Sequence, residues 1–309
     1  MKVKPENFMN IAFAALTFAA AITTLFIVSG IFISLFGESL PAINKFGFFK
    51  FVFSTSWDPV RETFGAAITL YGTIITTIIA LILAVPVSIG IAIFITELCP
   101  NILKPAFSTV IELLAAIPSI IYGMWGLFTL APIMGTYVEP LLQKLFGDIP
   151  VIGHLFEGTT QGIDILTTSL ILSIMITPFI ASIARDTFDL TPKPLRESAY
   201  GVGATQWEVI KDVIIPYCKK GVYGSVIIAM GRALGETMAV AFVLGNRHHI
   251  ATSLFDASAT ITVTLANEFT EADNGIYLSS LFLLALILFI MNFFVLAIAK
   301  FFLTGRDKI

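Results

Sequence analysis

Six long apolar segments limit what this chain can fold into more than any other feature of its sequence. A helix needs about 20 mostly apolar residues to cross a bilayer. The segments lie near residues 9–36, 66–96, 106–133, 163–184, 222–245 and 277–303. The chain is 57% hydrophobic and only 13% charged, whereas soluble domains carry roughly 25% charged residues, so a soluble core could not enclose them. We therefore predict an all-α polytopic membrane protein, in which residues 1–309 form a single transmembrane domain of six helices.

The positions of lysine and arginine indicate how the segments are oriented, because cytoplasmic loops of membrane proteins are enriched in both. With a cytoplasmic N-terminus, twelve of the 18 basic residues fall in inner segments, including Lys2 and Lys4, and five fall in outer ones. An odd number of spans would place Lys300, Arg306 and Lys308 outside. We therefore expect both termini to be cytoplasmic.

The sequence offers little metal or redox chemistry. Cys99 and Cys218 fall on the cytoplasmic side, where thiols stay reduced. The outer-loop residues His154, His248 and His249 have no further ligands at a spacing that suits zinc. We expect these histidines to be solvated or to contact a partner, and we expect no metal or cofactor.

The inner loop at 185–221 differs from the other loops because it is long, polar and punctuated by prolines such as Pro192 and Pro216. Its middle part combines good helix formers with alternating apolar and charged residues. We predict short amphipathic helices parallel to the membrane, interrupted around Gly201 and Gly203. Such helices either lie on membrane lipid or contact a cytoplasmic protein.

One motif in this loop is specific: Glu197-Ser198-Ala199, then Gly203, then Val213-Ile214-Ile215-Pro216. Its spacing resembles the cytoplasmic loop signature of permease subunits in bacterial ABC importers, Glu-Ala-Ala, Gly and Ile-x-Leu-Pro, with small or apolar replacements at three positions. The resemblance implies a coupling helix that docks in a groove of an ATPase subunit. Gly203 would supply a turn or a close approach there. The chain has no Gly-x-x-x-x-Gly-Lys-Ser/Thr phosphate loop, so if ATP powers this protein, another polypeptide must bind it.

The fifth apolar segment contains two charged residues, Arg232 and Glu236, which is expensive in a bilayer and indicates function by default. Residues four apart share one helix face, and a rise of 1.5 Å per residue from Val222 puts Arg232 about 15 Å deep. Gly231 and Gly235 beside them would let another helix approach closely. The charges form either a structural ion pair or an anion site, since guanidinium suits tetrahedral oxyanions. In the second case Glu236 would limit the attraction and prevent a permanent trap.

The stretch around these charges, Gly231-Arg-Ala-Leu-Gly-Glu-Thr-Met-Ala-Val240, continues to Leu244-Gly245-Asn246 and resembles PstC-type permeases of phosphate-specific ABC transporters. The sister permease of such transporters shares the Gly-Arg-Ala-x-Gly-Glu core, so Thr237-Met238-Ala239 and the long N-terminal region favour PstC. Further similar stretches are Ala115-Ala116-Ile117-Pro118-Ser119, Tyr122-Gly123, Trp125-Gly126 and Ala266-Asn267-Glu268-Phe269.

This resemblance implies a type I importer permease in a prokaryotic cytoplasmic membrane, surrounded by lipid and without catalytic chemistry of its own. The implied partners are a PstA-like sister permease, two copies of a PstB-like ATPase subunit and an extracytoplasmic PstS-like phosphate-binding protein. No nucleic acid is expected. A permease for another oxyanion, such as sulfate or molybdate, is the nearest alternative, because a fold alone does not select the substrate.

Two further residues are candidates for the substrate pathway. Glu112 lies about two turns into the third segment and either contacts substrate or pairs with a loop cation. Ser119 follows Pro118, where a kink frees backbone groups. An intramembrane enzyme using Arg232, Glu236 and Glu112 on a lipid phosphate, or a passive anion channel, would leave the loop motif unexplained.

Overall fold

The computed structural model describes residues 5–150, 152–273 and 275–304, and nearly all of them lie in helices or the turns between helices. Within this described part, six helices are long and apolar enough to cross a membrane. They are α1 (Pro5–Phe46), α3 (Ala67–Ile93) with its π-helical end η1 (Phe94–Leu98), a curved helix at 119–146, α8 (Ile165–Asp189), α11 (Ile215–Leu234) and α14 (Ile276–Thr304).

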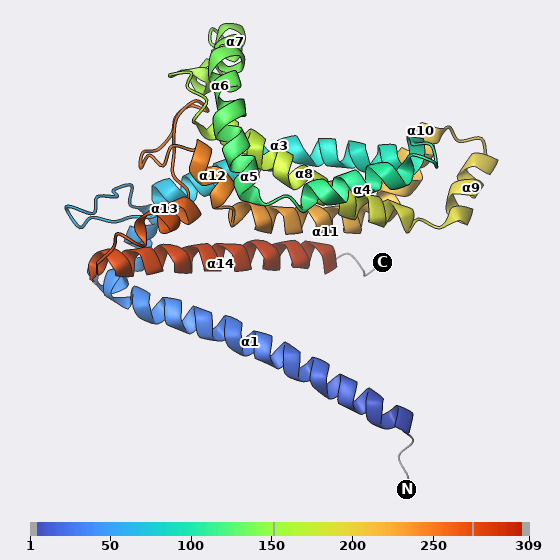
Figure 1. The fold of residues 1–309 in the computed structure, drawn as a ribbon, viewed down its shortest axis with the longest axis horizontal. Helices are drawn as coiled ribbons and strands as arrows, with labels where there is room; N and C mark the ends of the chain where they lie inside the picture. Colours follow the sequence, from blue (N-terminus) through green and yellow to red (C-terminus); the bar gives the residue numbers. More distant parts are fainter. Residues whose placement is uncertain (1–4, 151, 274, 305–309) are drawn as a thin grey trace.

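Four of these helices, α3, α8, α11 and α14, lie side by side along one direction (Figure 1). The short helices α9 (Lys193–Gly201) and α10 (Gln206–Glu208) lie at one end of this bundle, and α12 (Met238–Val243) and α13 (Ile261–Glu268) lie toward the other. The first residues of α1 and the last of α14 point toward the end that carries α9. The terminal cations Lys2, Lys4, Arg306 and Lys308 lie outside the described residues.

Helix α8 is the centre of the bundle because two thirds of its most apolar window, 67%, is buried. It packs against α3 and α11, and its side chains form the middle of the main apolar core. By contrast, α1 diverges from the bundle (Figure 1), and none of its most apolar window is buried. The core residues that α8 contributes include Ile171, Leu172, Met175, Ile176 and Ile180.

Prolines account for three of the π-helical segments in the described residues. A proline inside a helix lacks the N–H that would bond four residues back, and its ring clashes with that carbonyl. A π-helical turn, with its wider i→i+5 pattern, removes the conflict. Three π-helical segments end two positions before a proline within a continuing helix: η2 (Gly126–Leu130) before Pro132, η3 (Met134–Val138) before Pro140 and η5 (Val209–Ile214) before Pro216. The fourth in the described residues, η1, ends its helix before Pro100, which lies outside it.

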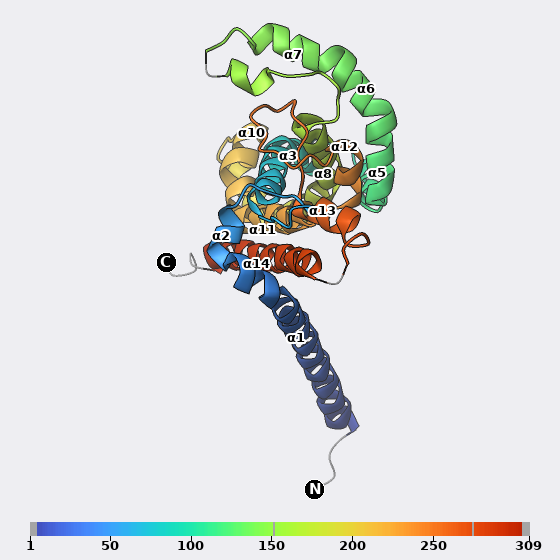
Figure 2. The same ribbon diagram turned by 90° about the vertical axis from the view of Figure 1, so that its left-hand side faces the viewer.

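The prediction of one continuous third span at 106–133 is wrong. Helix α4 (Lys104–Ala115) ends three residues before Pro118, and a new helix begins at Ser119. Proline cannot continue the helix, and it biases the preceding residue toward extended conformations. The new helix runs through α5 (Ser119–Trp125), α6 (Ala131–Ile133) and α7 (Glu139–Phe146) and curves away from the bundle as an arch (Figure 2).

Candidate functional site

The fifth span ends earlier than the sequence predicted, directly between its two charged residues. Helix α11 ends at Leu234, and α12 begins at Met238. The prediction that Arg232 and Glu236 share one helix face is therefore wrong. The Glu236 carboxylate accepts a hydrogen bond from the Ala239 backbone N–H at 3.2 Å, and the Glu236 carbonyl accepts one from the Thr262 hydroxyl at 2.7 Å. These two contacts hold the backbone in its non-helical course.

Arg232 has no ion pair or hydrogen bond to any residue that the structure describes. Its guanidinium carbon lies 5.8 Å from the centroid of the Phe179 ring on α8. Its Nε is buried without a hydrogen-bond partner. A cation over an aromatic face is attracted by the ring, but it keeps its hydrogen-bond donors. The bundle thus contains a positive charge with free donors, next to a helix break.

The two glycines beside these charges differ in their surroundings. A Cβ atom on Gly231 would lie 3.6 Å from the Leu296 side chain of α14, which is ordinary contact distance. At Gly235 only the preceding turn of the same helix is near. The close helix approach predicted at this ridge therefore involves Gly231 alone.

Glu112 and Ser119, the other two candidates for the substrate pathway, lie on α4 and at the start of α5. The Glu112 carboxylate accepts a hydrogen bond from the Arg185 guanidinium at 3.0 Å, near the C-terminal end of α8. Of the two roles that the sequence left open for Glu112, the structure shows the pairing with a cation. Ser119 is half-buried at the first position of α5.

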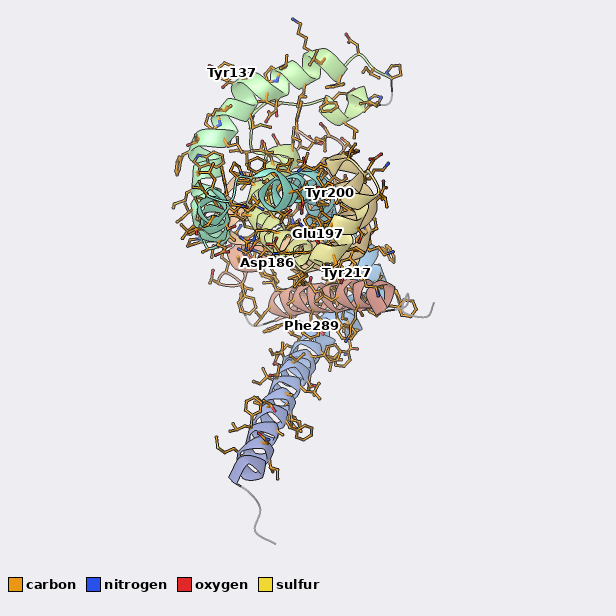
Figure 3. All side chains as sticks on the ribbon, turned by 90° about the vertical axis from the view of Figure 1, so that its right-hand side faces the viewer. Tyr137, Asp186, Glu197, Tyr200, Tyr217 and Phe289 are labelled. Carbon is orange, nitrogen blue, oxygen red and sulfur yellow. The ribbon has the colours of Figure 1, made fainter. Side chains whose placement is uncertain are left out.

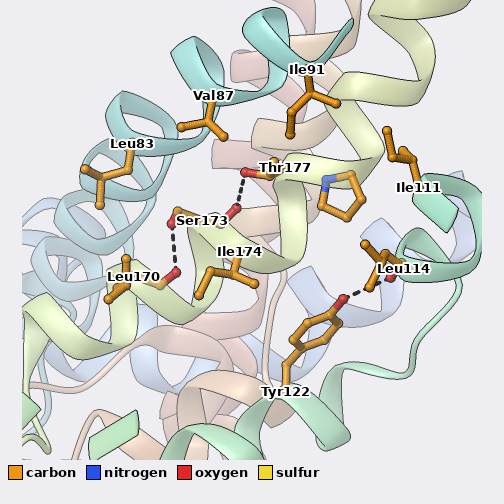
Figure 4. A pocket seen from close by; sticks show the side chains of 11 residues that line it. Leu83, Val87, Ile91, Ile111, Leu114, Tyr122, Leu170, Ser173, Ile174 and Thr177 are labelled. Carbon is orange, nitrogen blue, oxygen red and sulfur yellow. Dashed lines mark hydrogen bonds between the residues drawn. The ribbon is translucent and has the colours of Figure 1, made fainter. Parts of the chain in front are cut away.

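A groove of about 440 Å³ opens between α3, α4, α5 and α8 (Figure 4). Its lining is almost entirely aliphatic, and the hydroxyls of Ser173 and Thr177 donate to carbonyls of their own helix at 2.7 Å. Tyr122 donates to the Leu114 carbonyl at 3.0 Å. With its hydroxyls engaged and no cation in its lining, the groove is unsuited to an anion.

The predicted docking motif lies at the end of the bundle, where Glu197 and Tyr200 are labelled in Figure 3. Glu197 and Ser198 are exposed on α9, whereas Ala199 packs against the apolar cluster at this end. Val213, Ile214 and Ile215 join the same cluster. The motif therefore combines outward polar positions with inward apolar ones, as a helix resting on the bundle and facing a partner requires.

Gly203 explains the interruption after α9. Its φ is +93°, a conformation that glycine adopts without strain, and no atom lies within 4 Å of where a Cβ would stand. Of the two expectations for this residue, the turn is confirmed and the close approach is not. The predicted break near Gly201 and Gly203 is present, with α10 starting after a capping box formed by Thr205 and Glu208.

The attachment of this loop to the spans was not predicted. Arg196 donates to Glu97 of η1 at 2.5 Å and to the Phe188 carbonyl of α8 at 2.6 Å. The Glu97 backbone carbonyl also accepts a hydrogen bond from the Gln206 side chain at 3.0 Å. Two features of the sequence could have indicated this pairing. They are the lone carboxylate at the end of the second apolar segment and the cation directly before Glu197.

Glu268 organises the end of the bundle opposite α9. Its carboxylate accepts hydrogen bonds from Trp57 at 2.8 Å and from Tyr277 at 2.7 Å, and it lies 3.0 Å from His248 Nε2. Burial raises the pKa of Glu268, but these donors outweigh burial and leave the pKa below its usual value. The expectation that His248 is solvated or contacts a partner is wrong, because it packs inside the chain and stacks on Trp57 at 5.6 Å.

A second pair of acidic residues is buried where the arch meets α8. Glu139 and Asp164 are 0% and 1% exposed. Asp164 caps α8 by accepting the Thr167 N–H at 2.8 Å, and Glu139 accepts the Gly162 N–H at 3.3 Å. Burial, reinforced by the neighbouring Glu139 carboxyl, raises the pKa of Asp164 to about 8.

Residues 84–304 match the family of binding-protein-dependent transport system inner membrane components. The phosphate transport system permease protein PstC of Mesorhizobium japonicum is 55% identical over 295 residues, which cover 96% of this chain and 90% of that protein. PstC of Pasteurella multocida is 46% identical over 303 residues, which cover 98% and 94%.

Solved structures of ABC importers share the fold. One chain of a bacterial alginate ABC transporter superimposes with a TM-score of 0.63 at 14% identity, covering 97% of this chain and 98% of that one. A chain of the MetNI methionine ABC transporter gives a TM-score of 0.52 at 13% identity, covering 76% and 93%.

Proposed function

The chain belongs to the PstC family of phosphate transport system permease proteins, and from this premise we propose how it moves its substrate. It is a multi-pass inner-membrane permease of an ATP-driven inorganic phosphate importer, and it works with an ATPase and a binding protein.

Arg232 is the residue that meets phosphate. The observation that carries this proposal is the free guanidinium inside the bundle, with no carboxylate paired to it among the described residues. An uncompensated charge among spans is costly unless water or an anion reaches it. The planar fork of guanidinium donors matches the oxygens of a phosphate. The Phe179 ring holds the group between passages without occupying its donors.

Glu236 acts on this pathway through the backbone. Its carboxylate and its carbonyl are both engaged at the helix break, which lies directly after the span that carries Arg232. Irregular backbone at membrane depth is tolerated where it is packed in protein or lines a watery cavity. Ser119 is a secondary candidate for a contact with the anion, and Glu112 stabilises the inner ends of α4 and α8 through Arg185.

The exposed positions of α9, led by Glu197 and Ser198 with the turn at Gly203, dock on the ATPase. The complete complex contains a PstA-like sister permease, two PstB-like ATPase subunits and a PstS-like binding protein. The end of the bundle with α9 and both termini faces the cytoplasm, which is supported by the basic residues of the inner loops.

The test is ATP-dependent uptake of labelled phosphate by the reconstituted complex, with sulfate as competitor. We expect uptake that resists sulfate and is lost in Arg232→Gln although the complex assembles. Normal uptake in Arg232→Gln would contradict the role of this residue. Competition by sulfate would favour a broader oxyanion permease.

A further inference from the structure

Helix α9 has a second side, which faces the spans. Arg196 directly precedes the exposed Glu197, yet its side chain is only 20% exposed and its partner Glu97 only 8%. Consecutive residues of a helix point about 100° apart, so adjacent positions can serve different surfaces. Glu197 faces the cytoplasm-facing surface of the loop, and Arg196 faces the spans.

Arg196 divides its guanidinium between two spans. One nitrogen donates to the Glu97 carboxylate at 2.5 Å, and the other donates to the Phe188 carbonyl at 2.6 Å. Glu97 lies in η1, at the end of α3, and Phe188 lies in the last turn of α8. Carbonyls in the last turn of a helix lack a helical partner and accept such donors readily. One rigid group therefore ties α9 to the inner ends of both helices.

Additional contacts make this attachment stiff. The Gln206 side chain of α10 donates to the Glu97 carbonyl at 3.0 Å. The Lys104 ammonium of α4 holds η1 itself by donating to the Thr96 carbonyl at 2.5 Å. Ala199 packs on the apolar cluster beneath, which contains Phe188. A displacement of α9 must therefore either carry η1 and the end of α8 with it or separate a largely buried charge pair, and the second course is costly.

We propose that Arg196 is a positioning residue for transport, which transmits each displacement of α9 to the inner ends of α3 and α8. Arg196 contacts neither phosphate nor ATP in this scheme and acts only through Glu97 and Phe188. The proposal rests on the proposed function, because it requires that α9 docks on an ATPase. Its consequence is that ATP hydrolysis and phosphate movement separate when the Arg196 contacts are removed.

The experiment measures phosphate uptake and ATP hydrolysis in the same proteoliposomes containing the complete complex. In Arg196→Met we expect assembly and ATP hydrolysis to persist, and phosphate moved per ATP to fall about tenfold, within the usual range of coupling between sites. In Arg196→Lys, phosphate moved per ATP should lie between the wild-type and Arg196→Met values, because an ammonium lacks the planar fork that serves two acceptors. The double variant Arg196→Glu/Glu97→Arg, which exchanges the two charges, should recover part of the lost phosphate movement per ATP.

Controls separate this proposal from its premise. Lys219→Met removes an exposed cation from α11, outside the docking surface, and should leave phosphate moved per ATP unchanged. Absence of ATP-dependent phosphate uptake in the wild-type complex would instead refute the proposed function. An unchanged ratio in assembled Arg196→Met complexes would overturn the role of Arg196. If Arg196→Met complexes do not assemble, the same ratio of phosphate moved per ATP is measured in Glu97→Gln, which keeps the side-chain size. An unchanged ratio in that variant would equally overturn the role of Arg196.

Discussion

Arg232 and Glu236 stand four positions apart, yet α11 ends between them and each has a different partner. The Arg232 guanidinium lies over the Phe179 ring at 5.8 Å, whereas the Glu236 carboxylate accepts the Ala239 N–H at 3.2 Å. Separate partners mean separate energetic roles, which mutation can distinguish.

The first prediction is that Arg232 and Glu236 contribute independently. Glu236→Ala should lower stability by about 1 kcal/mol through loss of the hydrogen bond from the Ala239 N–H, while Glu236→Gln, which keeps an acceptor oxygen, should cost less. Arg232→Gln should remove uptake whichever residue stands at 236. Thermal unfolding in detergent and phosphate uptake of the single and double variants check this. Recovery of uptake in the double variant would indicate an ion pair instead.

The second prediction concerns the outer cluster around Glu268. Trp57→Phe removes a donor at 2.8 Å and leaves a carboxylate oxygen with one partner fewer, so we expect a loss of about 1–3 kcal/mol in unfolding free energy. The exposed Phe49, changed to Ala, is the matched control and should cost little. Equal stability of Trp57→Phe and wild type would show that the cluster does not hold the outer loops.

The pH dependence of the same residue follows from its lowered pKa. The folded protein then binds fewer protons at Glu268 than the unfolded chain does, so the ionised form stabilises the fold above the ordinary value of 4.5. That contribution disappears as pH falls through the lowered pKa. Glu268→Gln should therefore be less stable than wild type at neutral pH, with the difference shrinking toward acid. A difference independent of pH, measured by thermal unfolding, would contradict this assignment.

The third prediction concerns Asp164, whose pKa shift has the opposite sign. Burial raises its pKa from 3.8 to about 8, so the folded protein binds more protons than the unfolded chain across that window. Stability from this group therefore falls as pH rises. The stability of Asp164→Asn relative to wild type should therefore increase from acid to mildly basic pH.

Hydrogen exchange of the segment at 159–168, corrected for intrinsic rates, measures this difference. Exposed Asp148, changed to Asn, is the control from the same outer region. A difference between Asp164→Asn and wild type that stays constant with pH would exclude a buried proton at this site.

The fourth prediction compares two glycines of the docking loop. Gly203→Ala places a residue with a Cβ at φ +93°, which costs about 1–2 kcal/mol, although the added methyl group would contact no other atom. Gly201→Ala, at the last position of α9, should be neutral or stabilising by up to about 1 kcal/mol. Thermal stability of the complex and its ATPase content check both. Unchanged thermal stability and ATPase content in Gly203→Ala would mean that the turn adopts another backbone conformation without cost.

Properties of the local chain were predictable from the residues alone. The length of each apolar run decides whether a helix can cross the membrane, so six candidate spans were found in advance. The spacing from Glu197 to Pro216 indicated the loop signature, and its break near Gly203 followed from glycine chemistry. These features depend on neighbours a few positions away.

Contacts between residues far apart in the sequence determined the features that local sequence did not predict. No periodicity pairs Arg196 with Glu97, which is 99 positions away, or Trp57 with Glu268, 211 positions away. Helix ends were misplaced near Pro118 and Gly235 because apolar composition continues through both breaks, whereas a few polar contacts and one proline interrupt the helices. Whether a buried charge is paired depends on which helices pack around it, and only the tertiary structure separated Arg232 from Glu236.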